Sequence, residues 1–192
     1  MKKILLLLPV LLALTTAAQN ISEIRQYYTE INTKITQSLE QGFEGPLYNN
    51  HWVTNHHNRS WPAVGNYSET TDFWYDDPPY HLPAEERDPK NVLVKVTMTR
   101  ISSHLKADEE YLFKDGKLIF FFRKEAEEGQ QWETRIYFDN QGAVIKTSVK
   151  ANNRELTDKD FLTEEFRDFR PDGVAVMEVA KKYQDLFVKS NS

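Results

Sequence analysis

Imidazole and carboxylate side chains gather in one stretch of the chain, where their chemistry would suit a metal ion. This stretch holds histidines and acidic residues in the order His51, His56, His57, Asp72, Asp76, Asp77 and His81. Zinc and similar divalent ions are bound by imidazole nitrogens and carboxylate oxygens. A metal site with ligands drawn from His51, His56, His57, Asp72 and Asp76 would support a metal-assisted hydrolase.

The spacing of these residues is a weaker sign of a metal site than their types. His51 and His56 do not fit the His-Glu-x-x-His pattern of zinc hydrolases. His56 and His57 are neighbours, so on a strand they would point to opposite faces. Surface or structural histidines are therefore the simpler explanation.

Aromatic side chains fill the same stretch and suit a binding surface. The candidates for ligand contact are Trp52, Trp61, Trp74 and Tyr75. Flat rings of this kind can hold a sugar or a peptide, because they bury area while their polar edges stay available. The alternative is that the rings plug the loops onto a sheet, in which case they are buried and do not converge.

Nucleophilic catalysis has little support in the sequence. The chain has no cysteine and no Gly-x-Ser-x-Gly motif. Ser103 and His104 are adjacent, and adjacent residues on a strand face apart. A carboxylate hydrolase would need two carboxylates at a fixed separation, whereas the acidic runs Asp108–Glu110 and Glu125–Glu128 border predicted hairpins, as solvated charge does.

The first 18 residues have the pattern of a cleavable signal peptide. Lys2 and Lys3 precede an apolar stretch from Ile4 to Leu14, and small residues lead to Ala18. Cleavage there would leave residues 19–192 as a single domain, and the absence of cysteine excludes a lipid anchor on a cysteine. We expect a periplasmic or secreted protein with no membrane insertion after cleavage.

The net charge of the chain argues against some classes of binding partner. Loss of Lys2 and Lys3 takes the net charge from −5 to −7, and no basic block is present. This argues against nucleic acid and anionic membrane surfaces. No cofactor is predicted.

Hydrophobic periodicity places a helix near each end. Apolar residues recur at helical spacing after Asn20, which with Glu23 resembles a capping box, and this helix should stop at Gly42. A second helix follows Pro171-Asp172-Gly173, and a short helical turn is expected across residues 157–169.

Between the helices the period changes to two, which indicates strands. Strands are expected at residues 92–99, 110–113, 117–123, 132–138 and 143–149, with hairpin turns at Asp115-Gly116 and Asp139–Gly142. Residues 42–90 should add one or two strands, at Trp52–Thr54 and Thr71–Tyr75. The predicted fold is α+β: an antiparallel meander of about five strands packed against N- and C-terminal helices. The strand through Phe121 should be central, with a helix on one face and a loop or ligand on the other.

Two parts of the sequence resemble segments of other proteins. Asn58–Tyr67 followed by Phe73–Tyr75 resembles uncharacterised small exported proteins of Gram-negative bacteria. The paired units Tyr111–Ile119 and Tyr137–Ile145 are similar to the Tyr-x-Phe-x-x-x-Gly-x-Leu/Ile hairpin units of such families. The resemblance implies export and an α+β fold, and it implies no activity.

These patterns favour a non-enzymatic binding protein over an enzyme. Its ligand, a sugar, a peptide or another protein, would lie between the segment at residues 42–90 and the sheet. The alternatives are a metal-assisted or carboxylate hydrolase and a protein-interaction or inhibitory module.

Overall fold

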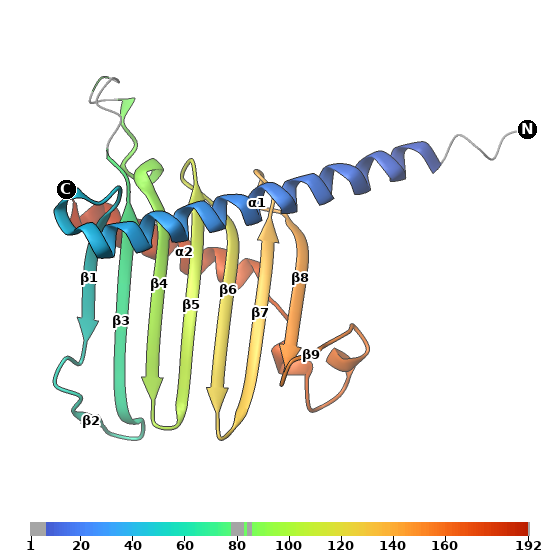
Figure 1. Ribbon diagram of the computed structural model, residues 1–192. Coiled ribbons are helices and arrows are strands. Elements are labelled where there is room, and N and C mark those ends of the chain that lie inside the picture. Colours follow the sequence, from blue (N-terminus) through green and yellow to red (C-terminus); the bar gives the residue numbers. More distant parts are fainter. Residues whose placement is uncertain (1–6, 78–82, 84–85, 192) are drawn as a thin grey trace, which may run out of the picture.

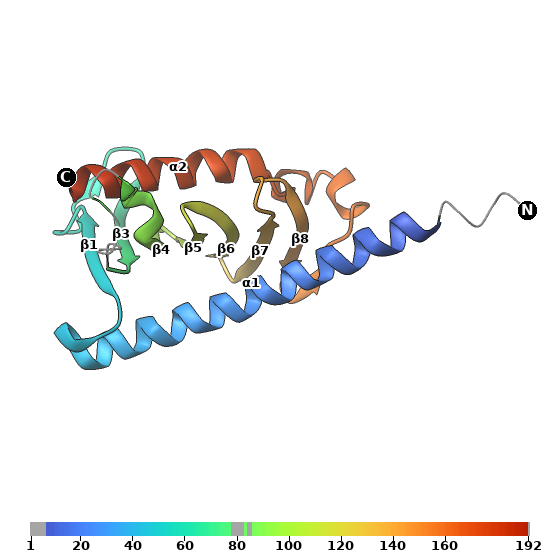
Figure 2. The same ribbon diagram turned by 90° about the horizontal axis from the view of Figure 1, so that it is seen from above.

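The computed structural model describes residues 7–77, 83 and 86–191, with the side chains of the first helix described from residue 20 onward. One antiparallel sheet dominates the structure, and a long helix crosses each of its faces (Figures 1 and 2). His81, which the sequence offered as a further metal ligand, lies outside the described residues. The α+β class with helices from both ends of the chain is confirmed.

The sheet has nine strands, so the prediction of about five was too low. The strands are β1 Tyr48–Thr54, β2 Ser60–Trp61, β3 Gly65–Tyr75, β4 Leu93–Ser102, β5 Leu105–Lys114, β6 Lys117–Glu127, β7 Gln130–Phe138, β8 Val144–Ala151 and β9 Arg154–Glu155. Their order is β1-β3-β4-β5-β6-β7-β8-β9, with β2 paired to β3, and every pairing is antiparallel.

The five predicted strands correspond to β4 through β8. The segment before them supplies β1, β2 and β3, and the two-residue β9 follows them. The two candidate strands proposed there lie within β1 and β3. Strand β3 is 11 residues long, and its first half is the polar run Gly65–Thr70. That run has no alternation of apolar and polar residues, so the periodicity of the sequence could not show its full length.

Two hairpin turns have the geometry that the sequence predicts. Asp115 and Gly116 both have positive φ, at 50° and 70°, between β5 and β6. In the β7–β8 turn, the Asp139 carboxylate accepts hydrogen bonds from the backbone N–H groups of Gln141 and Ala143, and Gly142 has a φ of 83°. Both arrangements are typical of tight hairpins.

Helix α1, Leu7–Gln41, crosses one face of the sheet. Its Ile24 and Ile31 are buried against Trp74, Leu112 and Phe120. The helix ends where predicted, because Gly42 takes a φ of 62°. The start predicted at Asn20 is wrong, since the helix runs without a break from Leu7, within the predicted signal peptide.

Helix α2, Gly173–Ser190, crosses the opposite face (Figure 2). The Asp172 carboxylate caps its start by accepting hydrogen bonds from the N–H groups of Val174 and Ala175. Phe187 and Ala180 are buried against Phe73 and Tyr111. The predicted loop or ligand on the second face of the central strand is therefore a helix: Phe120 faces α1 and Phe121 faces α2.

Short helical turns fill the remaining corners. They are the 3-10 turns η1 Gly42–Glu44, η3 Pro89–Val92, η4 Asp160–Leu162 and η5 Arg167–Phe169. The last two lie in the segment where a helical turn was predicted, and this segment covers the end of the α2 face with Phe161 and Phe166 against Trp132 and Leu156.

Candidate functional site

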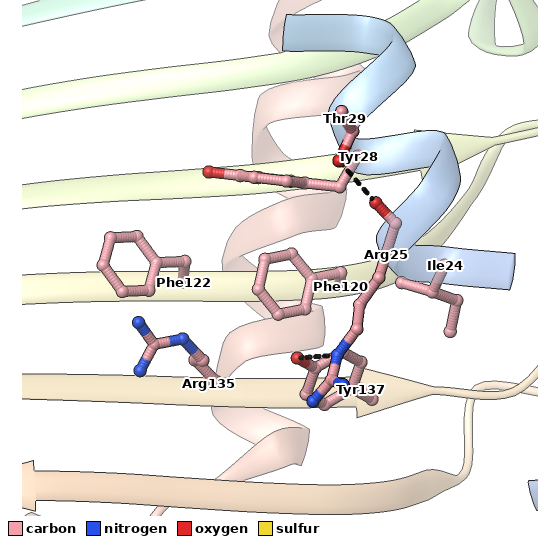
Figure 3. A pocket seen from close by; sticks show the side chains of 8 residues that line it. All are labelled: Ile24, Arg25, Tyr28, Thr29, Phe120, Phe122, Arg135 and Tyr137. Atoms are coloured by element: carbon pink, nitrogen blue, oxygen red, sulfur yellow. Dashed lines mark hydrogen bonds between the residues drawn. The ribbon is translucent and has the colours of Figure 1, made fainter. Parts of the chain in front are cut away.

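A pocket of about 280 Å³ lies between α1 and the strands β6 and β7 (Figure 3). We refer to it as the α1 pocket. Its lining consists of Ile24, Arg25, Tyr28, Thr29, Phe120, Phe122, Arg135 and Tyr137. The volume is near the lower end of the range of about 300–1,000 Å³ that is usual for ligand sites.

The elements around the pocket explain how these side chains come together. Ile24 and Tyr28 are four residues apart on α1, so they share the face of the helix that meets the sheet. Phe120 and Phe122 are alternate residues of β6, and in the register they lie opposite Tyr137 and Arg135 of β7. Alternation along two paired strands therefore places four side chains in one patch under the helix.

Aromatic rings form the base of the pocket. The Phe120 ring lies edge-on to Tyr28 at 5.4 Å and tilted against Tyr137 at 4.8 Å, measured between ring centroids. Phe120 and Tyr137 are buried, whereas Phe122 is partly exposed. The base thus offers both a fixed apolar surface and an accessible ring.

Two guanidinium groups flank this base (Figure 3). Arg25 Nε donates a hydrogen bond to the Tyr137 hydroxyl at 3.4 Å. Arg135 lies over the Phe122 ring, with Cζ 4.9 Å from the ring centroid, and pairs with Glu133 at 2.9 Å. Within the described part of the chain, Arg25 has no carboxylate within ion-pair distance, and the lining contains no acidic side chain.

A buried polar cluster lies beside the pocket, on the far side of Tyr28. Lys95 Nζ is 2.7 Å from Glu110 Oε2 and 2.6 Å from Asn32 Oδ1, and the Tyr28 hydroxyl donates to Glu110 at 2.7 Å. Burial raises the pKa of Tyr28 to about 12, and the Glu110 charge adds to this. Burial also lowers the pKa of Lys95, against the opposing effect of Glu110. The charge of Glu110 is thus balanced by Lys95 and leaves the two arginines uncompensated by this carboxylate.

Each of the larger hollows elsewhere has a carboxylate in its lining: Glu178, Glu165 or Glu30. A hollow of about 560 Å³ beside α2 is lined by Lys90, which pairs with Asp185, and by Gln184, which donates to the Gly116 carbonyl. Another, of about 500 Å³, is lined by Arg154, which pairs with Asp160. Because its lining has two guanidinium groups and no carboxylate, the α1 pocket is the stronger candidate for an anionic ligand.

The α1 pocket suits binding better than catalysis. Its eight lining side chains include no carboxylate, imidazole or thiol. These are the commonest groups in general acid–base and nucleophilic steps, and among the Tyr and Thr side chains that the lining does contain, burial raises the pKa of Tyr28 to about 12. Guanidinium groups over aromatic rings instead match an anion that carries a flat or apolar body.

The structure brings together one pair of the five predicted metal ligands. His51 and Asp72 lie opposite each other on β1 and β3, with Nδ1 2.8 Å from Oδ1. The rings of His56 and His57 lie 5.1 Å apart in the loop after β1, and Asp76 follows β3. Across the described ranges, no group of three or more His, Asp or Glu side chains is placed to hold a metal ion.

The four predicted ligand-contact rings do not form one cleft. Trp74 is buried on the α1 face, and its neighbour Tyr75 packs against Phe187 on the opposite face. The ring centroid of Trp52 lies 5.3 Å from that of Phe73, also on the α2 face, and the Trp61 ring stacks on the Tyr67 ring with a centroid distance of 4.6 Å. None of these four rings lines the α1 pocket. Trp74 and Tyr75 lie on different faces because neighbouring residues of a strand point to opposite sides.

Arg25 and Arg135 are the residues that the sequence analysis missed. Arg135 did give a signal, because it is a charged residue inside the otherwise apolar second half of a predicted strand. Arg25 gave none, since it follows Ile24 on an amphipathic helix where a charged neighbour is expected. Their meeting depends on how α1 crosses the sheet.

A comparison with protein families, with curated proteins and with solved structures finds no match to this chain.

Proposed function

We propose that this protein is a non-enzymatic binding protein, exported from the cytoplasm, which holds a small anionic ligand with an apolar body in the α1 pocket. The observation that carries the proposal is the placement of Arg25 and Arg135 over an aromatic base with no acidic side chain in the lining. A carboxylate or phosphate group would accept hydrogen bonds from the guanidinium groups. An aromatic or aliphatic body would rest on Phe120 and Phe122.

The pocket contrasts in its charge with the chain as a whole. The net charge of the chain is −5, so a general attraction of anions by the protein is not available. Local guanidinium groups must therefore supply the attraction. A small pocket with few polar groups fixes the orientation of its ligand through those groups.

Export rests on the leader sequence, and the fold is compatible with its removal. In Figure 1 the N-terminal part of α1 projects beyond the sheet, and the first residue that lines the pocket is Ile24. Cleavage after Ala18 would leave the whole lining in place. Among the residues described, no helix has both the length and the apolar character needed to span a membrane.

Thermal-shift and calorimetric measurements with matched probes test the proposal. Benzoate and phenyl phosphate carry an anion on a ring, while benzamide and benzylamine offer a similar ring with a neutral or cationic group. We expect the two anions to stabilise the protein, by about 2.7 kcal/mol at 100 times the dissociation constant. Equal stabilisation by benzamide or benzylamine would contradict the proposal.

Paired arginine variants locate the site. Arg25→Met with Arg135→Met should abolish the stabilisation by benzoate and leave the apolar base intact. Arg167→Met is the matched control, because Arg167 is exposed on η5, far along the chain from the pocket lining. Retention of benzoate binding by the double variant would show that the ligand does not use the α1 pocket.

The hydrolase alternative stays a prediction of the sequence. The His51–Asp72 pair supplies two potential ligands, whereas zinc sites use three or four protein ligands. Elemental analysis after zinc loading tests this alternative, and one bound zinc per chain that is lost in Asp72→Asn would support it.

A further inference from the structure

The two edges of the sheet differ in how they are protected. At one edge, β9 pairs with the end of β8, and the N–H of Leu156 donates to the Val149 carbonyl. The other half of β8 carries Lys146, and edge lysines discourage pairing with another chain. At the opposite edge, β1 ends the path of paired strands, and within the described residues no strand pairs with its outer side.

Strand β1 lacks the features that usually protect an edge. Its sequence is Tyr-Asn-Asn-His-Trp-Val-Thr, with no Lys, Arg, Asp, Glu or Pro. Its register with β3 runs over seven residue pairs without a bulge. Natural proteins protect edge strands with charge, proline, bulges or covering segments, so a long, neutral and regular edge is suited to pairing.

Exposed apolar side chains are concentrated at this edge. Five of them fall within 15 consecutive residues, at the end of α1, on the connection that follows and on β1: Leu39, Phe43, Tyr48, Trp52 and Val53. Phe43 is 95% exposed, and Trp52 and Val53 are 39% and 42% exposed on the strand itself. Exposed apolar groups gathered in this way are typical of an interaction surface.

We propose that β1 pairs antiparallel with β1 of a second copy of this chain, which joins two sheets into one across a two-fold axis. Charge favours a second copy as the partner, because two identical neutral strands place no like charges opposite each other. A neutral β1 also has no charged side chain that would select a different, oppositely charged peptide. Because the β8 edge is protected, the described part of each chain has one open edge, at β1. The assembly therefore closes as a dimer and does not grow into a filament.

Sedimentation analysis of the mature chain over a range of concentrations tests the proposal. The wild-type chain should sediment as a dimer that dissociates on dilution. Val53→Lys places two lysines at the interface and should raise the dimer dissociation constant about tenfold or more. Ile101→Lys is the matched control, since Ile101 is 43% exposed on the inner strand β4, and it should leave the constant unchanged.

Cysteine cross-linking gives a second, independent measurement. The natural chain has no cysteine, so single-Cys variants at each position from Tyr48 to Thr54 report only on contacts between copies. In an antiparallel pair about a two-fold axis, one residue of β1 lies opposite its own copy, close enough for a disulfide. One position should therefore cross-link far more efficiently than the others, and Ile101→Cys should not cross-link.

Each outcome decides for or against the β1 dimer. A wild-type chain that stays monomeric at its highest soluble concentration overturns the proposal. A dimer that survives Val53→Lys and shows no peak of cross-linking along β1 uses a different surface, which also overturns it. If Val53→Lys fails to fold by circular dichroism, the cross-linking profile alone supports or overturns the proposal.

Discussion

On the α2 side of the sheet, Phe73, Tyr111 and Phe121 pack against the buried Phe187. On the α1 side, strands β4, β5 and β7 place Lys95, Glu110 and Arg135 next to Tyr28 and the pocket. Successive residues of one strand thus supply a core to each helix, and each side holds a buried charged group: Lys95 on the α1 side and Glu109 on the α2 side, where Glu109 accepts a hydrogen bond from Tyr111.

The two sides differ in the α1 pocket, which has two guanidinium groups and no carboxylate in its lining, and not in the presence of buried charge. Rings and aliphatic groups that are fully buried contribute hydrophobic free energy without the desolvation cost of charged groups. Both sides give up part of this gain. On the α1 side, Lys95 is desolvated and compensated by Glu110 and Asn32. On the α2 side, Glu109 is desolvated and compensated by Tyr111 and Arg123. On the α1 side, the desolvated Lys95 and Glu110 lie beside the pocket in which the proposed ligand would bind.

Phe187→Ala should have the largest effect on stability. Phe187 is 1% exposed, and the removal of a large buried ring costs about 3–5 kcal/mol in unfolding free energy. Urea denaturation followed by circular dichroism measures this loss. Leu186→Ala, at a position that is 40% exposed, should cost much less, and benzoate affinity should not change in either variant. A loss in Phe187→Ala as small as that in Leu186→Ala would show that the α2 face is not the principal core.

Lys95→Met tests the polar cluster on the α1 side. Breaking a fully buried ion pair costs about 3–5 kcal/mol, and here we expect about 2 kcal/mol because the Glu110 side chain is 23% exposed. Adding Glu110→Leu should recover much of the loss, since no uncompensated carboxylate remains. Urea denaturation of the three proteins measures this, and failure of the second change to recover stability would mean that packing, not charge, explains the first.

Asp172→Ala tests how α2 is held on its face. Its carboxylate satisfies two N–H groups at the start of the helix, so its loss should lower the unfolding free energy by about 1 kcal/mol. Thermal and urea denaturation report the change, with the exposed Asp158→Ala as the control. Equal effects of the two substitutions would indicate that surface charge matters and the cap does not.

Asp160→Asn should have the smallest effect, and one that depends on pH. Hydrogen bonds from Thr157 and Arg154 lower the pKa of Asp160 from 3.8 to about 2. A carboxyl whose pKa is lowered by folding stabilises the folded state at pH values above the pKa that it has in the unfolded chain. This contribution disappears as the pH falls from about 4 to about 2. The wild-type protein should therefore be slightly more stable than Asp160→Asn at pH 7, with the difference vanishing near pH 2. A difference that does not vary with pH would rule out this role of the ionised carboxylate.

Much of the architecture could be predicted from the sequence because local signals determine it. The alternation of apolar residues predicted β4 to β8, and Asp115-Gly116 and Gly142 predicted their turns. Strand β3 could not be predicted at full length, because its polar first half becomes a strand only through pairing with β4. The start of α1 was also misplaced, since a capping pattern is a local preference that a continuing helix overrides.

The sequence by itself determined the α+β class, the two helices, the hairpin turns and the aromatic and acidic character of the chain. Only the tertiary structure decided that Trp74 and Tyr75 face opposite sides and that His51 pairs with Asp72. It also decided that Arg25 reaches Tyr137 and lines the same pocket as Arg135. The physical reason is that periodicity records which residues share a face of one element. Which faces then meet depends on strand order and on how each helix crosses the sheet. Both depend on contacts between residues more than a hundred positions apart in the sequence, such as Arg25 and Tyr137.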